Sequence, residues 1–127
     1  MKKIIYILTV FFMVISCSGV SNKGNVSSLP RTPASGKASW YGNQFNGRPT
    51  ASGEIFSERE LTAAHPSLPF GSVVEVTNLE NKKKIRVRIN DRGPFTKGRV
   101  IDLSKEAFSR IADVNKGIIE VDIKVIK

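Results

Sequence analysis

The stretch KIRVRINDRGPF, residues 84–95, decides the fold of this chain. Apolar Ile85, Val87 and Ile89 alternate with polar residues, which is the pattern of a strand with one buried face. The strand runs into Asp91, and a Gly-Pro pair then ends it. Asp91 therefore has two interpretations: an acid that opens a turn, or an acid held in a cleft for chemistry.

Further segments complete a set of short strands. They are GKASWYG (36–42), SVVEVTN (72–78), VIDL (100–103) and GIIEVDIKVI (117–126). In the last of these, Val125 is expected on the buried face with Ile119, Val121 and Ile123. Residues 79–82 are typical of a hairpin turn, and Ser104 is expected to cap a helix over 105–112. Several short strands and one helix predict a small closed barrel or a sandwich.

The N-terminal third differs from the rest. Residues 1–16 have two lysines and then an apolar run, as in a secretory signal peptide. Cys17 follows Val-Ile-Ser as in a bacterial lipobox, so we expect it to be lipidated; the alternative is an ordinary signal peptide with an incidental cysteine. Residues 17–35 are rich in Ser, Gly, Asn and Pro, which predicts a flexible tether, and residues 36–127 form the expected folded domain.

Charge and composition limit which kinds of partner and cofactor this protein is expected to have. The chain has 20 Lys and Arg against 11 Asp and Glu, and an exported basic protein favours an anionic partner such as a cell-wall polymer. Residues 81–88, NKKKIRVR, also resemble a nucleic-acid footprint, but export argues against nucleic acid. The alternative is a solvated basic face or a surface that binds the cell wall. With one cysteine and one histidine, neither an internal disulfide nor a zinc site of the usual kind is expected, and no cofactor is implied.

The loops carry the candidate chemistry. WYGNQFNGRPTASGE, residues 40–54, sets aromatic residues among polar ones, an arrangement that suits a sugar ring; the alternative is that Trp40 belongs to the core and the glycines form turns. His65 is either a hydrogen-bonding structural group or a catalytic partner. Arginines flanking Asp91 favour its charged form, whereas burial favours its neutral form.

Three segments together resemble the rare lipoprotein A (RlpA) family. They are GKASWYGNQFNGRPTASGEIF, LTAAHPSLPFGSVVEVTNLEN and VRINDRGPF followed by GRVIDLS, in that order, and they cover residues 36–127. The resemblance implies a mostly β fold, a small six-stranded double-psi β-barrel with one or two short helices. It also implies peptidoglycan glycan strands as the substrate class.

The resemblance implies site residues as well. Asp91 matches the family's catalytic acid, and Glu54 and His65 match its other active-cleft positions. Candidate substrate-binding residues are Tyr41, Thr50, Arg88, Arg92 and Asn90. Many members have an aspartate three residues after the motif glutamate, where this chain has Ser57 followed by Glu58. The sequence ends after the last expected strand, so the C-terminal SPOR domain of longer members is not expected.

Two functions remain open at this point. The first is an endolytic lytic transglycosylase, a lyase that cleaves the β-1,4 bond between N-acetylmuramic acid and N-acetylglucosamine and leaves 1,6-anhydromuramoyl ends. The second is a non-catalytic, expansin-like lipoprotein that binds peptidoglycan. In either case we expect an exported monomer, anchored to a cell membrane through Cys17. Ser18 after the cysteine indicates the outer membrane, facing the periplasm, in a host that has one.

Overall fold

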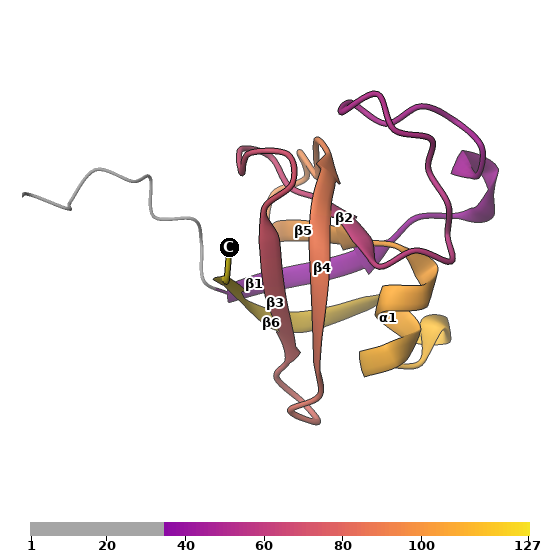
Figure 1. Ribbon diagram of the computed structural model, residues 1–127. Coiled ribbons are helices and arrows are strands. Elements are labelled where there is room, and N and C mark those ends of the chain that lie inside the picture. The colour runs from indigo at the N-terminus through magenta and orange to yellow at the C-terminus, as the bar shows by residue number, and fades with distance from the viewer. Residues whose placement is uncertain (1–34) are drawn as a thin grey trace, which may run out of the picture. The chain divides into compact units, whose positions relative to one another are not determined.

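The computed structural model describes residues 35–127. These contain six strands, one α-helix and two short 3-10 helices (Figure 1). The strands are β1 (Ser35–Trp40), β2 (Thr62–Ala64), β3 (Val73–Asn78), β4 (Lys84–Asp91), β5 (Arg99–Leu103) and β6 (Ile118–Val125). The helices are α1 (Lys105–Ile111), η1 (Asn43–Phe45) and η2 (Val114–Lys116). The predicted signal peptide, the lipidation of Cys17 and the tether lie outside the described residues.

The six strands close into a barrel in the order β1-β5-β2-β4-β3-β6, with β6 paired back to β1. Two pairs are parallel, β1 with β5 and β2 with β4, and the other four are antiparallel. The structure therefore decides for the barrel and against the sandwich, and it confirms the mostly β class. Closure pairs every described strand on both sides, so none of them is a free edge.

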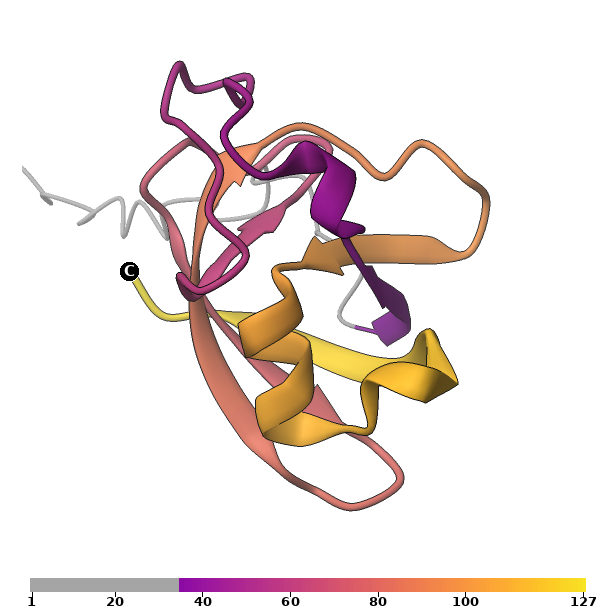
Figure 2. The same ribbon diagram turned by 90° about the vertical axis from the view of Figure 1, so that its right-hand side faces the viewer.

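The core fills the barrel and continues under α1 through Ala107, Phe108 and Ile111. Figures 1 and 2 show this helix lying against the barrel. Ser104 caps the helix as predicted, because its Oγ accepts a hydrogen bond from the Ala107 N–H. Phe108 on α1 is fully buried, and its ring centroid lies 6.5 Å from that of Trp40. Trp40 is thus packed against the core, and its Nε1–H donates to the Val114 carbonyl at 3.0 Å.

One prediction about the strands is wrong, and one strand was not predicted. Val125 is 49% exposed rather than buried with Ile119, Val121 and Ile123, because it lies at the last position of β6. The strand that was not predicted from the sequence is β2. This strand has three residues, all buried, so no alternation of polar and apolar residues marks it.

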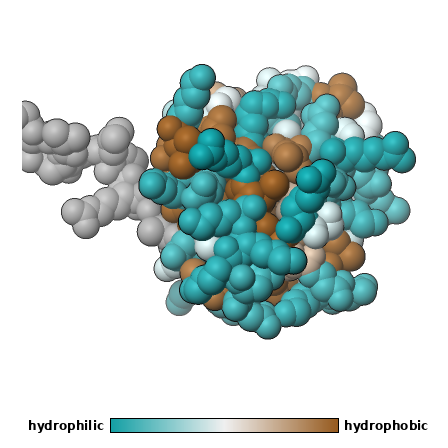
Figure 3. All heavy atoms as spheres, turned by 60° about the horizontal axis from the view of Figure 1, so that its bottom comes forward, coloured by the Kyte–Doolittle hydropathy of each residue, from teal (hydrophilic) through white to brown (hydrophobic). Residues whose placement is uncertain are grey.

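The outer surface is largely polar. Figure 3 shows hydrophilic side chains over most of the face that it presents, with small hydrophobic areas between them. Among residues 35–127, no helix has the length and apolar character needed to cross a membrane.

Candidate active site

A β-bulge in β4 sets the direction of Asp91. In the pairing of β4 with β2, Ala63 lies opposite Ile89 and Ala64 lies opposite Asp91, so Asn90 is the extra residue. Strict alternation would put Asp91 on the buried face with Ile89. The bulge instead buries both Ile89 and Asn90 and turns Asp91 to a half-buried position at the strand's end. Bulges commonly re-aim side chains beside active sites in this way.

The Asp91 carboxylate is held at both oxygens. Oδ1 accepts hydrogen bonds from the backbone N–H groups of Ala51 and Arg92, each at 2.9 Å. Oδ2 accepts from the Tyr41 hydroxyl at 3.2 Å. The three donors come from different segments of the chain, so the orientation of this carboxylate depends on the fold rather than on a local turn.

One of those donors belongs to a tight turn that rests on the end of β4. The Ser52 N–H donates to the Asn90 carbonyl at 3.2 Å, beside the bond from Ala51. The turn is closed by two backbone bonds, one from Gly53 to the Thr50 carbonyl and one from Thr50 to the Glu54 carbonyl. Gly53 has a φ of 89°, which favours glycine. In Figure 1 the segment between β1 and β2 reaches toward the upper end of β4.

Tyr41 is packed so that its hydroxyl faces Asp91. Its ring makes edge contacts with Phe56, at 4.9 Å between centroids, and with Phe45, at 5.8 Å. Burial raises the pKa of the Tyr41 phenol far above its usual value, and the charges of Asp91 and Asp102 raise it further. The phenol is therefore neutral at physiological pH and serves as a hydrogen-bond donor.

These residues line a cleft of about 220 Å³. Its walls consist of Tyr41, Phe45, Arg48, Pro49, Thr50, Phe56, Asp91 and Arg92. Four of the predicted site residues therefore share one cleft: Asp91, Tyr41, Thr50 and Arg92. Arg48, Pro49 and Phe56 were not predicted from the sequence as site residues. Arg48 and Pro49 lie within the aromatic and glycine-rich segment 40–54, and Phe56 lies two residues after it, so their place in the sequence was a signal.

Glu54 and Arg88 form an ion pair beside this cleft and do not line it. Arg88 Nη1 donates to both Glu54 oxygens at 2.7 Å. Hydrogen bonds from Arg88, and then from Asn90, lower the pKa of Glu54, so it is a charged acceptor. Asn90 is only 2% exposed, although the sequence placed it on the polar face with Arg88. The pair joins the 50–54 turn to β4.

His65 also lies outside the cleft lining, buried behind Asp91. Its backbone N–H donates to the Asp91 carbonyl at 3.1 Å. Its Nδ1 accepts hydrogen bonds from the N–H groups of Ser67 and Leu68, at 3.1 and 3.0 Å. Burial lowers the pKa of the imidazole, and the Arg92 charge lowers it further. The geometry thus describes a neutral histidine that holds the 65–68 turn against the end of β4.

This neutral state predicts a dependence of stability on pH. Below about pH 6.5 the unfolded chain takes up a proton at His65 that the folded protein takes up only at lower pH. The free energy of unfolding should therefore fall as the pH is lowered from about 6.5 toward the folded-state pKa, and His65 should have no effect above that window.

His65→Asn keeps an acceptor near the position of Nδ1 but does not titrate in this range. We expect the Tm of the wild type to fall more steeply than that of the variant between about pH 7 and about pH 5, measured by thermal unfolding. His65 is the only histidine, so no other imidazole confuses the comparison. Parallel curves for the two proteins would contradict this assignment.

Arg92 is engaged with the same turn. Its Nη1 donates to the Leu68 carbonyl at 2.8 Å, and its guanidinium carbon lies 3.9 Å from the centroid of the Phe70 ring. Arg92 lines the cleft, but its charged end already has protein partners. Its main effect is to join the 65–70 segment to the Asp91 end of β4.

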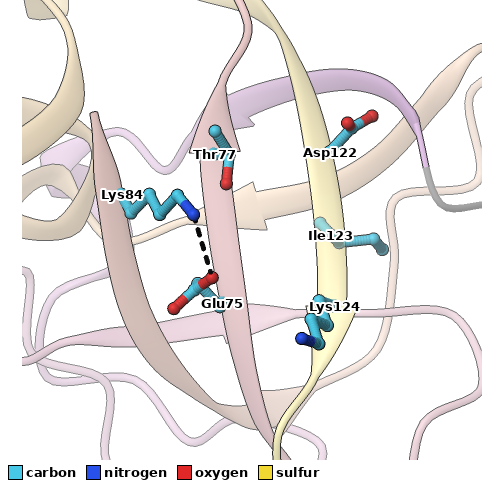
Figure 4. A pocket seen from close by; sticks show the side chains of 6 residues that line it. All are labelled: Glu75, Thr77, Lys84, Asp122, Ile123 and Lys124. Carbon is cyan, nitrogen blue, oxygen red and sulfur yellow. Dashed lines mark ion pairs between the residues drawn. The ribbon is translucent and has the colours of Figure 1, made fainter. Parts of the chain in front are cut away.

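A larger hollow of about 390 Å³ lies elsewhere, on the outer face of β3, β4 and β6 (Figure 4). Its lining residues are Glu75, Thr77, Lys84, Asp122, Ile123 and Lys124. The Lys84 Nζ lies 3.7 Å from Glu75 Oε1, so two of its charges already face each other. None of the hydrogen bonds of the described residues holds an acid of this hollow as three donors hold Asp91, and its size alone does not make it the site.

Ser57 and Glu58, where this chain departs from the expected aspartate, do not line the Asp91 cleft. Glu58 instead borders a hollow near α1, with Lys105 and Ser109. Within residues 35–127, no group of three or more His, Cys, Asp or Glu residues is arranged to hold a metal ion.

Comparisons with known proteins agree with this geometry. The family described as lytic transglycolase matches residues 33–123. A probable endolytic peptidoglycan transglycosylase RlpA from Treponema pallidum is 58% identical over 69% of this chain and 28% of its own length. The corresponding RlpA of Pasteurella multocida is 53% identical over 72% of this chain and 31% of its own. The chain thus spans about a third or less of these relatives.

Among solved structures, the apo expansin of Clavibacter michiganensis superposes with a TM-score of 0.60 at 26% identity. The match covers 74% of this chain and 50% of the expansin. The closed six-stranded barrel and this likeness confirm the double-psi β-barrel. The chain belongs to the RlpA family of lytic transglycosylase domains.

Proposed function

We propose that this protein is an endolytic lytic transglycosylase that cleaves the glycan strands of peptidoglycan between N-acetylmuramic acid and N-acetylglucosamine. The observation that carries the proposal is the Asp91 carboxylate, held by three donors in a cleft with aromatic walls. The names of the relatives support it, since these proteins are 58% and 53% identical to this chain over the aligned region.

A lytic transglycosylase can work with one carboxyl group. Protonated Asp91 gives its proton to the glycosidic oxygen as the bond to C1 of the muramoyl residue breaks. The resulting carboxylate then accepts the proton of the C6 hydroxyl, whose oxygen bonds to C1 and closes the 1,6-anhydro ring. Atoms and charges balance without an activated water, so the second carboxylate of ordinary glycosidases is not required.

The neighbouring residues have positioning roles in this mechanism. The neutral Tyr41 phenol and the two backbone donors fix the plane of the Asp91 carboxyl group. The Glu54–Arg88 pair holds the turn that supplies the Ala51 donor, and His65 holds the turn on the opposite side. Phe45 is 41% exposed at the cleft wall, so its ring is available to the apolar face of a sugar.

One observation favours the second function, glycan binding without cleavage. Both Asp91 oxygens already accept hydrogen bonds from Tyr41, Ala51 and Arg92, so the side chain is oriented as an acceptor, whereas the first step of cleavage uses it as a proton donor. A binding-only barrel would keep the same cleft and use Asp91 as a hydrogen-bond acceptor for sugar hydroxyls. The reaction product separates the two functions.

The test is to incubate the full chain, purified in detergent, with intact and with peptide-stripped peptidoglycan and to analyse the products by mass spectrometry. A lytic transglycosylase leaves 1,6-anhydromuramoyl ends, and a hydrolase leaves reducing ends. New anhydro ends would support the proposal. Sedimentation of the protein with sacculi, without new ends of any kind, would support the binding-only function.

We further propose that the protein acts from a membrane, through a lipid on Cys17 and the segment 18–34. The support is the lipobox in the sequence. Metabolic labelling with a radioactive fatty acid should mark the wild type and leave Cys17→Ser unlabelled. Equal labelling of both would contradict the anchor.

A further inference from the structure

Three arginines of the barrel strands and the segment after β4 have structural partners. Arg88 is paired with Glu54, and Arg92 donates to backbone carbonyls and stacks on Phe70. Arg99 is paired with Asp102. These guanidinium groups hold the loops and strands of the site together.

Arg48 differs from these three. It lines the same cleft as Asp91, it is exposed, and within residues 35–127 its guanidinium has neither an ion pair nor a hydrogen bond. Its backbone, in contrast, is fixed on both sides. The Arg48 N–H donates to the Phe45 carbonyl at 3.1 Å, and the Arg48 carbonyl accepts from Phe56 at 2.8 Å. A planar fork of donors is thus carried on an ordered backbone at the cleft wall.

The electrostatics of the cleft make this group available to a ligand. Asp91, the carboxylate in the lining, has its oxygens engaged by Ala51, Arg92 and Tyr41. The positive charge of Arg48 therefore has no acidic partner in the described part of the protein. A guanidinium binds a carboxylate through two parallel hydrogen bonds, which are among the stronger polar contacts in proteins.

We propose that Arg48 is a specificity-determining residue that binds a carboxylate of the glycan ligand and so positions the strand over Asp91. This inference rests on the proposed function for the identity of the polymer. Peptidoglycan strands have two sources of this chemistry: the lactyl ether of N-acetylmuramic acid when it is free of peptide, and the stem peptide when it is present. A chitooligosaccharide has the same sugar backbone and no carboxylate.

The experiment measures equilibrium binding by calorimetry in an Asp91→Asn background, so that no ligand is consumed. The probes are peptide-free muramoyl oligosaccharide, the same oligosaccharide with its lactyl carboxyl converted to a methylamide, peptide-bearing oligosaccharide, and chitooligosaccharide. Arg48→Gln is compared with Arg48→Lys and with a control, Arg59→Gln. Arg59 is an exposed arginine that lies outside the Asp91 cleft and borders the hollow near α1.

We expect Arg48→Gln to raise the Kd about tenfold for a carboxylate-bearing ligand and to leave the Kd for chitooligosaccharide unchanged. Arg48→Lys should recover part of the loss, and Arg59→Gln should behave like the parent. If Arg48→Gln raises the Kd for the peptide-free oligosaccharide but not for its methylamide, the bound group is the lactyl carboxylate. If it raises the Kd only for the peptide-bearing oligosaccharide, the bound group is in the stem peptide.

Equal effects of Arg48→Gln on all four ligands, or no effect on any of them, would overturn the proposal. Because the readout is binding, the result does not depend on turnover. A protein that forms no anhydro ends but shows the Arg48 effect would contradict the proposed reaction and support this inference. A protein that forms anhydro ends, but in which Arg48→Gln changes the Kd equally for every ligand, would support the proposed reaction and contradict this inference.

Discussion

Asp91→Asn is expected to lower the release of anhydromuramoyl ends by about a thousandfold, within the range that general acid–base catalysis contributes. Asparagine has nearly the shape of aspartate, but it has no carboxyl proton to give and is too weak a base to accept one. Its Oδ1 still accepts from the Ala51 and Arg92 N–H groups, which bind Asp91 Oδ1 at 2.9 Å. The fold should therefore survive, with a change in stability of less than about 1 kcal/mol.

The measurement is the rate of formation of anhydro ends, with urea unfolding run beside it. Asp122→Asn is the matched control, because Asp122 is an exposed aspartate on β6 whose side chain borders the distant hollow on β3, β4 and β6. The control should keep the full rate. A folded Asp91→Asn protein with wild-type activity would remove Asp91 from the mechanism.

Phe108→Ala is expected to lower the free energy of unfolding by about 4 kcal/mol, which is the typical cost of removing a buried aromatic ring. Phe108 is fully buried where α1 meets the barrel, and its ring lies 6.5 Å from that of Trp40. The cavity would open between the helix and β1. A loss of this size is a large fraction of the stability of a small domain.

The effect can be followed by urea unfolding with the fluorescence of Trp40, the only tryptophan in the chain. Phe95→Ala is the matched control, because Phe95 is 83% exposed and its removal opens no cavity. It should shift the unfolding midpoint little. A loss below about 1 kcal/mol in Phe108→Ala would show that α1 is not part of the same cooperative core.

Most elements of the barrel can be predicted from the local pattern of polar and apolar residues. The alternation in β3, β4 and β6 is strong enough to identify strands, and Ser104 before an amphipathic run identifies α1. β2 could not be found in this way, because its three residues are all buried and are defined by pairing with β4 and β5. Closure of the barrel depends on that strand.

The site is less predictable than the barrel for a physical reason. The motifs identify Asp91 and Tyr41, but the bulge at Asn90 is a property of the pairing with β2 and leaves no mark on the strand itself. The roles of the arginines were also hidden. Arg88 and Arg92 were expected to meet substrate, yet both have protein partners. Arg48, whose guanidinium has no partner among residues 35–127, lines the cleft two positions before Thr50.

The double pairing of β1 has a mechanical consequence. This strand lies between β5 and β6, hydrogen-bonded on both sides, and it leads directly from Ser35 to Tyr41 at the cleft. If the cleft holds a glycan as proposed, a pull between that ligand and the N-terminal end of the barrel acts along β1. Because ladder hydrogen bonds run across a strand, such a load shears many of them together instead of opening them one after another. The pairing of β1 on both sides should therefore resist traction between the N-terminal end of the barrel and a ligand in the cleft.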